Sequence, residues 1–131
     1  MQFDLENLNP GTKFFFDDND EKKGSVTLRV CAGDDLRAIR KLSAKKKVEY
    51  RRGARIEYQD VNDEIENGLL WDFCIVNWEG VLNKHDELIL CTKENKVLLM
   101  GKSPSFAKFV GDKLSILAEL EEKEKEELEK N

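Results

Sequence analysis

Long hydrophobic runs are absent from this sequence. No apolar stretch exceeds four residues: residues 97–100 hold four and residues 14–16 hold three, whereas a membrane-spanning helix needs about 20. The opening residues, MQFDLENLNPG, contain neither the basic nor the apolar segment of a secretory signal. We therefore expect a soluble, cytoplasmic protein with no membrane partner.

Cysteine and histidine are scarce, with three cysteines and one histidine in 131 residues. An odd number of cysteines in a reducing compartment argues against a disulfide framework. Structural zinc sites usually contain ligands about two to four residues apart, and Cys31, Cys74, His85 and Cys91 are not spaced in this way. We expect no metal and no cofactor, and thiols that pack as small hydrophobic groups.

Signals for catalysis are also lacking. The eight glycines stand apart in the sequence, so no glycine-rich phosphate-binding loop is present. The spacing around Cys91 and His85 indicates no oriented base or oxyanion-binding element for a nucleophilic cysteine. Carboxylates cluster in residues 60–66, at a predicted helix start, where they complement the helix dipole. We expect no catalytic residues, and hence a protein that is not an enzyme.

Charge is distributed unevenly along the chain. Of the formal charge of −5, the segment ELEEKEKEELEKN, residues 119–131, contributes −4 with seven Glu and three Lys. Residues 37–55 instead hold nine Lys or Arg against the single Glu49, a local charge of +8. The molecule is therefore basic in its middle and acidic at its end.

Two interpretations of the basic segment stay open. It forms either a solvated hairpin face or a phosphate-contacting ribbon that uses Arg51, Arg52 and Arg55 of the basic hairpin 45–55. A sequence pI near 5.1, together with an acidic end that could fold back on this face, favours the solvated face. A nucleic-acid-binding module is the alternative function that this segment supports.

Strand signals occupy the first half of the chain. Val26, Leu28 and Val30 alternate with polar residues, and the polar residues 17–24 separate them from three phenylalanines at 14–16. A period of two is typical of a half-buried strand. We predict an antiparallel hairpin from these two runs.

A second hairpin is expected in KVEYRRGARIEYQDV. A two-residue turn at 52–53 would place Tyr50 opposite Arg55 and mix apolar and charged side chains on both faces. A three-residue loop at 52–54 places Tyr50 opposite Ile56 and gathers the apolar side chains on one face. We predict the three-residue loop, with the charged side chains together on the other face.

A short helix precedes this hairpin and a longer one follows it. Asp34 or Asp35 is expected to cap the short helix. The longer helix is predicted to start at Asp60 or Asn62 and to end near Glu79. It would carry a wide apolar surface that includes both tryptophans, Trp71 and Trp78, which are seven positions apart. These tryptophans are expected to lie in the core, the alternative being an exposed binding hot spot.

Two further helices are predicted in the last third. Thr92 is placed to cap a helix that Gly101 would end, and Ser103-Pro104 is a preferred entry to the last helix. The fold class predicted is α+β, with N-terminal antiparallel β-hairpins followed by three C-terminal helices packed as one domain. Residues 1–118 are expected to form that domain, and residues 119–131 an acidic, solvated helical tail.

The chain resembles a known group of proteins between about residues 45 and 117. LLWDFCIVNWEGVL, then an irregular link, then LCTKENKVLLMGKSPSFAKFVGDKLSIL resembles the carboxy-terminal half of small tail-assembly proteins of long-tailed bacteriophages and prophages, the tail-assembly-chaperone-like group. That group has a tryptophan-bearing helix, a loop, a "pCT-xENK-xxLM" segment and a "sP-xFaxFv" helix. The matching residues here are Trp71, Asp72, Trp78, Glu79, Gly80, Cys91, Thr92, Glu94, Asn95, Lys96, Leu99, Met100, Pro104, Phe106, Phe109 and Val110. The loop NKHDELIL departs from the group, which has a glycine-containing turn and a proline there.

The resemblance implies a non-enzymatic protein that binds the long tape-measure protein during tail assembly in the bacterial host. It implies that the tryptophans, Cys74 and Cys91 belong to the framework. For the partner contact we choose the last helix, at Lys108, Lys113 and Leu117, because the neighbouring phenylalanines are expected to be core. Phage or prophage origin and a homo-oligomeric state stay open.

Overall fold

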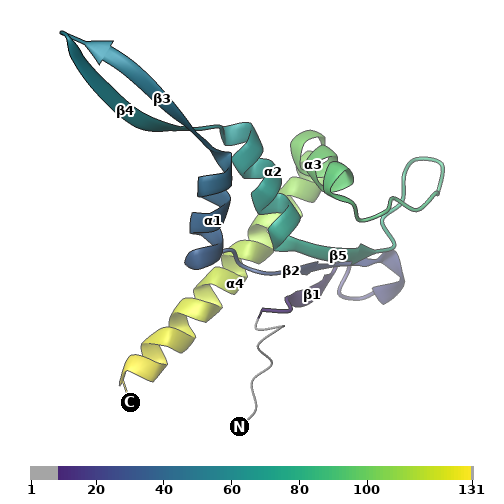
Figure 1. Ribbon diagram of the computed structural model, residues 1–131. Helices are drawn as coiled ribbons and strands as arrows, with labels where there is room; N and C mark the ends of the chain where they lie inside the picture. The colour runs from purple at the N-terminus through teal and green to yellow at the C-terminus, as the bar shows by residue number, and fades with distance from the viewer. Residues whose placement is uncertain (1–8, 131) are drawn as a thin grey trace. The chain divides into compact units, whose positions relative to one another are not determined.

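The computed structural model describes residues 9–130, except for the side chains of residues 125 and 128–130. The predicted α+β class is confirmed, because antiparallel strands occupy the first half and helices the last third (Figure 1). The described chain forms two compact units: a first unit of residues 9–30 and 71–130, and a second unit of residues 31–70. The predicted division into a domain of residues 1–118 and a tail stays a prediction.

Parts of the sequence analysis fall outside the described residues. The segment used to exclude a secretory signal lies mostly in residues 1–8, and the predicted acidic tail includes residue 131. Within residues 9–130, no helix is both long enough and apolar enough to cross a membrane.

The sheet of the first unit contains three antiparallel strands, in the order β1 (Thr12–Phe15), β2 (Ser25–Leu28), β5 (Ile75–Glu79). Phe14 lies opposite Val26 in the first pair, as the predicted hairpin requires. A short 3₁₀ helix, η1 (Glu21–Lys23), connects these strands. The first hairpin is therefore confirmed.

The second half departs from the predicted helix to Glu79. Helix α2 (Asp63–Cys74) begins after Asn62 as predicted, but it ends five residues early and strand β5 follows directly. Pairing with β2 places Ile75 opposite Leu28, and it buries both side chains completely. The prediction of helix at 75–79 was wrong because strand pairing outweighs helical periodicity in this β-branched and aromatic segment.

The core of the first unit lies between this sheet and helix α4 (Pro104–Lys130), which packs on β2 (Figure 1). Its buried residues are Val26, Leu28, Ile75, Trp78, Phe106 and Val110. Trp78 is 6% exposed, and Trp71 is partly buried against the same cluster. Trp78 belongs to the core as predicted, whereas Trp71 is only partly buried against it, and the two lie on different elements rather than on one helix.

Helix α3 (Lys93–Lys102) lies between the sheet and α4 in the sequence and packs against α4. The predicted cap is present, since Thr92 Oγ1 accepts a hydrogen bond from the backbone N–H of Asn95 at 3.2 Å. Gly101 is inside α3 and does not end it, because Ser103 occupies the C-cap position. Pro104 begins α4 as predicted.

The second unit contains α1 (Asp34–Ser43), β3 (Ala44–Arg51), β4 (Ala54–Val61) and the first eight residues of α2. Gly33, with φ of 57°, is the N-cap of α1, so the caps predicted at Asp34 and Asp35 were wrong. The carboxylates instead occupy the first turn, where they complement the helix dipole.

The register of the β3–β4 hairpin differs from the prediction. Arg51 pairs with Ala54 and Tyr50 with Arg55, so the turn has two residues, not three. Arg52 and Gly53 both have positive φ, at 51° and 78°, as a type I′ turn requires. This turn matches the twist of the strands, and it mixes apolar and charged side chains on both faces.

The backbones at Gly24 and Gly80 pack closely against each other in the first unit, and a substitution at Gly24 tests this contact. A Cβ on Gly24 would lie 2.4 Å from the carbonyl oxygen of Glu79, and φ there is 103°. Gly24→Ala should therefore lower the free energy of unfolding by about 2–4 kcal/mol. Gly111→Ala, in α4 with no atom within 4 Å of the added Cβ, should raise it by about 1 kcal/mol. Denaturant unfolding measures both, and equal effects would contradict the close approach of these two backbones.

Candidate functional site

An apolar groove in the first unit could receive a partner. Its volume is about 350 Å³. The lining residues are Phe16, Val81, Leu82, Ile89, Leu99, Ser103, Ser105, Phe106 and Phe109. Only the two serines among them carry polar side chains, so the groove suits an apolar ligand surface.

The loop of residues 81–91 forms one side of this groove. Trp78 Nε1–H donates to the carbonyl oxygen of Ile89 at 2.7 Å, and the Ile89 N–H donates to Val81 at 2.8 Å. The Asn83 side-chain oxygen accepts the backbone N–H groups of His85 and Glu87, which closes the turn. These bonds hold the loop, which contains neither glycine nor proline.

The rim of the groove exposes leucine side chains. Leu82 lines the groove and is 48% exposed, and Leu88, its partner in an isolated bridge, is 68% exposed. Leu90 in the same loop is also exposed. Sequence reasoning missed these residues, and the only available signal was the unusual density of leucine in the irregular segment VLNKHDELIL.

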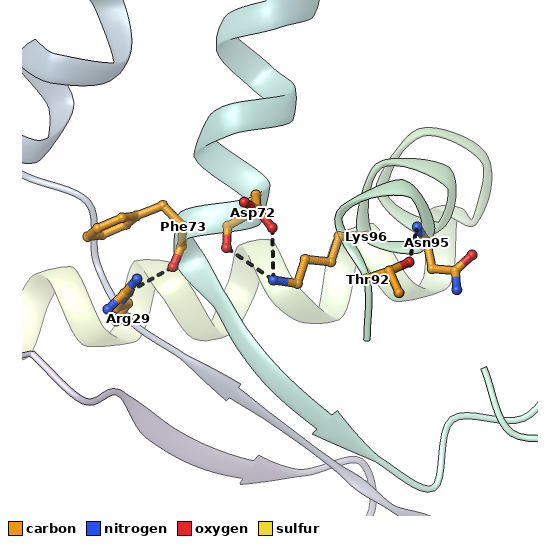
Figure 2. A network of polar contacts seen from close by, with 6 residues as sticks. All are labelled: Arg29, Asp72, Phe73, Thr92, Asn95 and Lys96. Atoms are coloured by element: carbon orange, nitrogen blue, oxygen red, sulfur yellow. Dashed lines mark hydrogen bonds and ion pairs between the residues drawn. The ribbon is translucent and has the colours of Figure 1, made fainter. Parts of the chain in front are cut away.

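Helix α3 is anchored by a buried lysine. Lys96 Nζ donates to the backbone oxygen and to the Oδ1 of Asp72, each at 3.1 Å, and the lysine is only 7% exposed (Figure 2). Asn95 Nδ2 donates to the carbonyl oxygen of Leu90 at 2.8 Å. Leu99 of the groove wall is therefore positioned by polar contacts one helical turn away.

Arg29 joins β2 to the end of α2. Its Nε donates to the carbonyl oxygen of Phe73 at 2.8 Å, and its guanidinium lies 3.9 Å from the centre of the Phe73 ring (Figure 2). Such a cation–π contact combined with a charge-assisted hydrogen bond fixes a planar group in one orientation. Arg29 is therefore a structural residue of the first unit.

The three residues predicted to bind a partner do not form one free surface. Lys108 is exposed on α4. The Lys113 ammonium lies 5.6 Å from the centre of the Phe14 ring and 5.5 Å from that of Phe109. Leu117 is half-buried and packs against the core cluster. Two of the three therefore contribute to the fold, and none lines the apolar groove.

Most charged side chains of the β3–β4 hairpin are paired within it. Glu49 accepts a hydrogen bond from the Tyr58 hydroxyl at 3.0 Å and pairs with Arg51 at 3.1 Å. Lys47 pairs with Asp60 at 2.7 Å. The bond to Glu49 raises the pKa of Tyr58 above its ordinary value, and the bond to Asp60 raises that of Lys47.

Arg55, of the alternative nucleic-acid contact, is paired as well. Its guanidinium lies 3.0 Å from Glu57, whose other oxygen is 3.0 Å from Lys46. Arg52 lies in the turn and forms no ion pair with the residues that the structure describes. Arg51 and Arg55 therefore already have carboxylate partners, unlike the free cations of a phosphate-binding ribbon.

Metal ligands do not converge within residues 9–130. No group of three or more His, Cys, Asp or Glu side chains is arranged there to hold an ion. Cys74 is buried, and Cys91 packs against the core cluster. Burial raises the pKa of the Cys91 thiol above its ordinary value, the opposite of what a reactive cysteine needs.

Comparison with known proteins identifies no family for this chain. No protein-family model, no curated protein and no solved structure matches the chain.

Removal of the Lys96 ammonium should destabilise the first unit. Lys96→Met keeps the apolar stem but leaves the Asp72 carbonyl and carboxylate without their donor, so we expect a loss of about 1–3 kcal/mol. Lys93→Met, at an exposed position on the same helix, should change stability by less than about 0.5 kcal/mol. Urea unfolding of both variants tests this, and similar midpoints would remove Lys96 from the anchoring role.

Cys91 should react slowly with alkylating agents. Its raised pKa means that the thiolate forms only at higher pH than in a free thiol, so the rate should still increase at about pH 9. Iodoacetamide labelling followed by peptide mass spectrometry gives the rate of this cysteine, with glutathione as the reference. A rate at Cys91 that reaches its plateau at lower pH than glutathione would contradict the burial of this thiol.

Proposed function

We propose that this chain is a tail-assembly chaperone or tail accessory protein of a phage or prophage, and that it binds the tape-measure protein in the bacterial cytoplasm. The proposal makes it a non-enzymatic binding protein without cofactors. Its starting point is the resemblance over about residues 45–117, and the observation that carries it is the apolar groove with its leucine rim.

The groove has the chemistry that a helical partner requires. Phe16, Phe106 and Phe109 supply aromatic surface to its lining, and the exposed Leu82 and Leu88 extend the apolar area outward. Amphipathic helices dock in such grooves through apolar residues spaced three and four apart. A long helical tail protein exposes stripes of this kind before assembly, and covering them prevents aggregation.

The segments that carry the resemblance build this groove and its support. Leu99, Phe106 and Phe109 line it, while Trp78 and Lys96 hold the loop and α3 in position. Apart from Phe16, the residues that line the proposed binding surface therefore lie in the part of the chain that resembles the tail-assembly group. We move the proposed contact from Lys113 and Leu117 to the groove, and we keep Lys108 as an exposed flanking cation.

Nucleic-acid binding by the hairpin is the weaker proposal. Arg51 and Arg55 are neutralised by Glu49 and Glu57 within the hairpin. Binding through phosphates needs cations that can release counterions, and it weakens steeply with salt. No feature of the described residues favours this function over protein binding.

The leucine rim supplies a sharp test. We expect co-expression with the tape-measure protein encoded beside this chain to raise the soluble yield of that protein and to give a co-purifying complex. Leu88→Lys should weaken the complex about 10-fold or more, because it places a charge in an apolar contact. Titration calorimetry or quantitative pull-down measures the change.

A matched control is available in the second unit. Leu42 on α1 is 72% exposed, close to the 68% of Leu88, so Leu42→Lys makes the same chemical change outside the groove and should leave binding unchanged. Lys108→Glu should reduce affinity by a smaller factor. A tape-measure protein that is equally soluble without this chain, with no co-purification, would contradict the proposed function.

A further inference from the structure

The β3–β4 hairpin of the second unit is a sheet of only two strands. All eight residues of β4 are exposed, among them Ile56 and Tyr58. In the described part of the chain β4 pairs with β3 alone (Figure 1). A two-stranded sheet is marginally stable by itself, and an open edge is a template for a further strand.

The two edges of this hairpin are protected differently. β3 carries three consecutive lysines, Lys45, Lys46 and Lys47, and lysine at an edge strand opposes pairing with another chain. β4, with the sequence ARIEYQDV, contains neither lysine nor proline. Its single positive charge, Arg55, is matched by Glu57 two residues later. The edge of β4 is therefore the one that is open to a new strand.

The turn fixes which backbone groups lie at that edge. A two-residue turn makes Arg51 and Ala54 a hydrogen-bonded pair, and antiparallel pairs then alternate between bonded and non-bonded. Even-numbered residues of β4 consequently direct their N–H and C=O groups toward β3. The odd-numbered residues Arg55, Glu57 and Gln59 direct theirs outward, where they are available to another strand.

The sequence of β4 is complementary to itself in one register. If two copies pair antiparallel about a two-fold axis at Ile56, each Ile56 lies opposite the other in a non-bonded position. Arg55 of each copy then lies opposite Glu57 of the second copy, and these are the residues with outward backbone groups. Opposite charges directly across an antiparallel pair are favourable, and the two apolar side chains meet at the closer spacing.

We propose that the edge of β4 binds the same edge of a second copy of this chain, which forms a four-stranded antiparallel sheet centred on Ile56. The interface is isologous, as in most closed dimers. The Arg55–Glu57 contact within one strand is exposed at both ends, so exchanging it for the contact between copies costs little. This inference uses the second unit and does not depend on the apolar groove.

Charge reversal tests the register as well as the interface. The full chain should form a concentration-dependent dimer by sedimentation between about 10 µM and about 1 mM. Arg55→Glu places Glu opposite Glu57, and Glu57→Arg places Arg opposite Arg55, so each variant should weaken the dimer about 10-fold or more. The double variant Arg55→Glu/Glu57→Arg restores opposite charges and should dimerise again.

Mixing the two single variants gives the most specific result. One strand then presents two glutamates and the other two arginines at positions 55 and 57, so a heterodimer should form although neither variant dimerises alone. Differently tagged variants make it detectable by co-elution, and it cannot arise from misfolded chains. Arg37→Glu, the same charge change on α1, should leave the wild-type dimer unaffected.

Three results would overturn the proposal. They are a wild-type chain that stays monomeric to about 1 mM, a dimer insensitive to both single reversals, and a mixture of the single variants that fails to associate. If the wild-type chain stays monomeric, the open edge of β4 would instead be available to a strand of a different protein.

Discussion

The side chain of Trp78 connects the three parts of the first unit on which the apolar groove depends. It lies opposite Val26 in the sheet, packs edge-on against Phe106 of α4 with ring centres 5.7 Å apart, and donates to the backbone of Ile89 in the loop. A large ring with a single polar atom can fill a core and still hold a loop, provided that the polar atom finds a partner. Its hydrogen bond links Ile89, a lining residue of the groove, directly to the core.

Much of this fold is predictable from local signals, and the errors occur where distant segments decide. The hairpin at Phe14 and Val26 and the cap at Thr92 depend on residues close in sequence, and they are present. The end of α2 depends on β2, nearly fifty residues earlier: Ile75 leaves the helix because Leu28 gives it a buried strand partner. Periodicity within one segment carries no information about such a partner.

The predicted register of the β3–β4 hairpin was wrong for a different reason. The prediction assumed that apolar side chains must share one face, which holds only when one face of a sheet is buried. All of β4 is exposed, so burial does not determine the register of the two strands. The turn determines it, and Arg52-Gly53 has the backbone conformation of a two-residue loop. The candidate site likewise could not be predicted from patterns within one segment of the sequence. The groove is formed by Phe16, a loop leucine and residues of two helices, which are far apart in the sequence.

The two proposed contact surfaces use different physical means, which has a consequence for assembly. The groove offers apolar side chains and suits a partner whose stripe must be hidden temporarily, whereas the β4 edge offers backbone hydrogen bonds and paired charges. They lie in separate compact units and share no residue. A dimer formed through Ile56 would carry two grooves, one in each copy. Two linked weak contacts would then bind more tightly than either alone, through effective concentration rather than through any added contact.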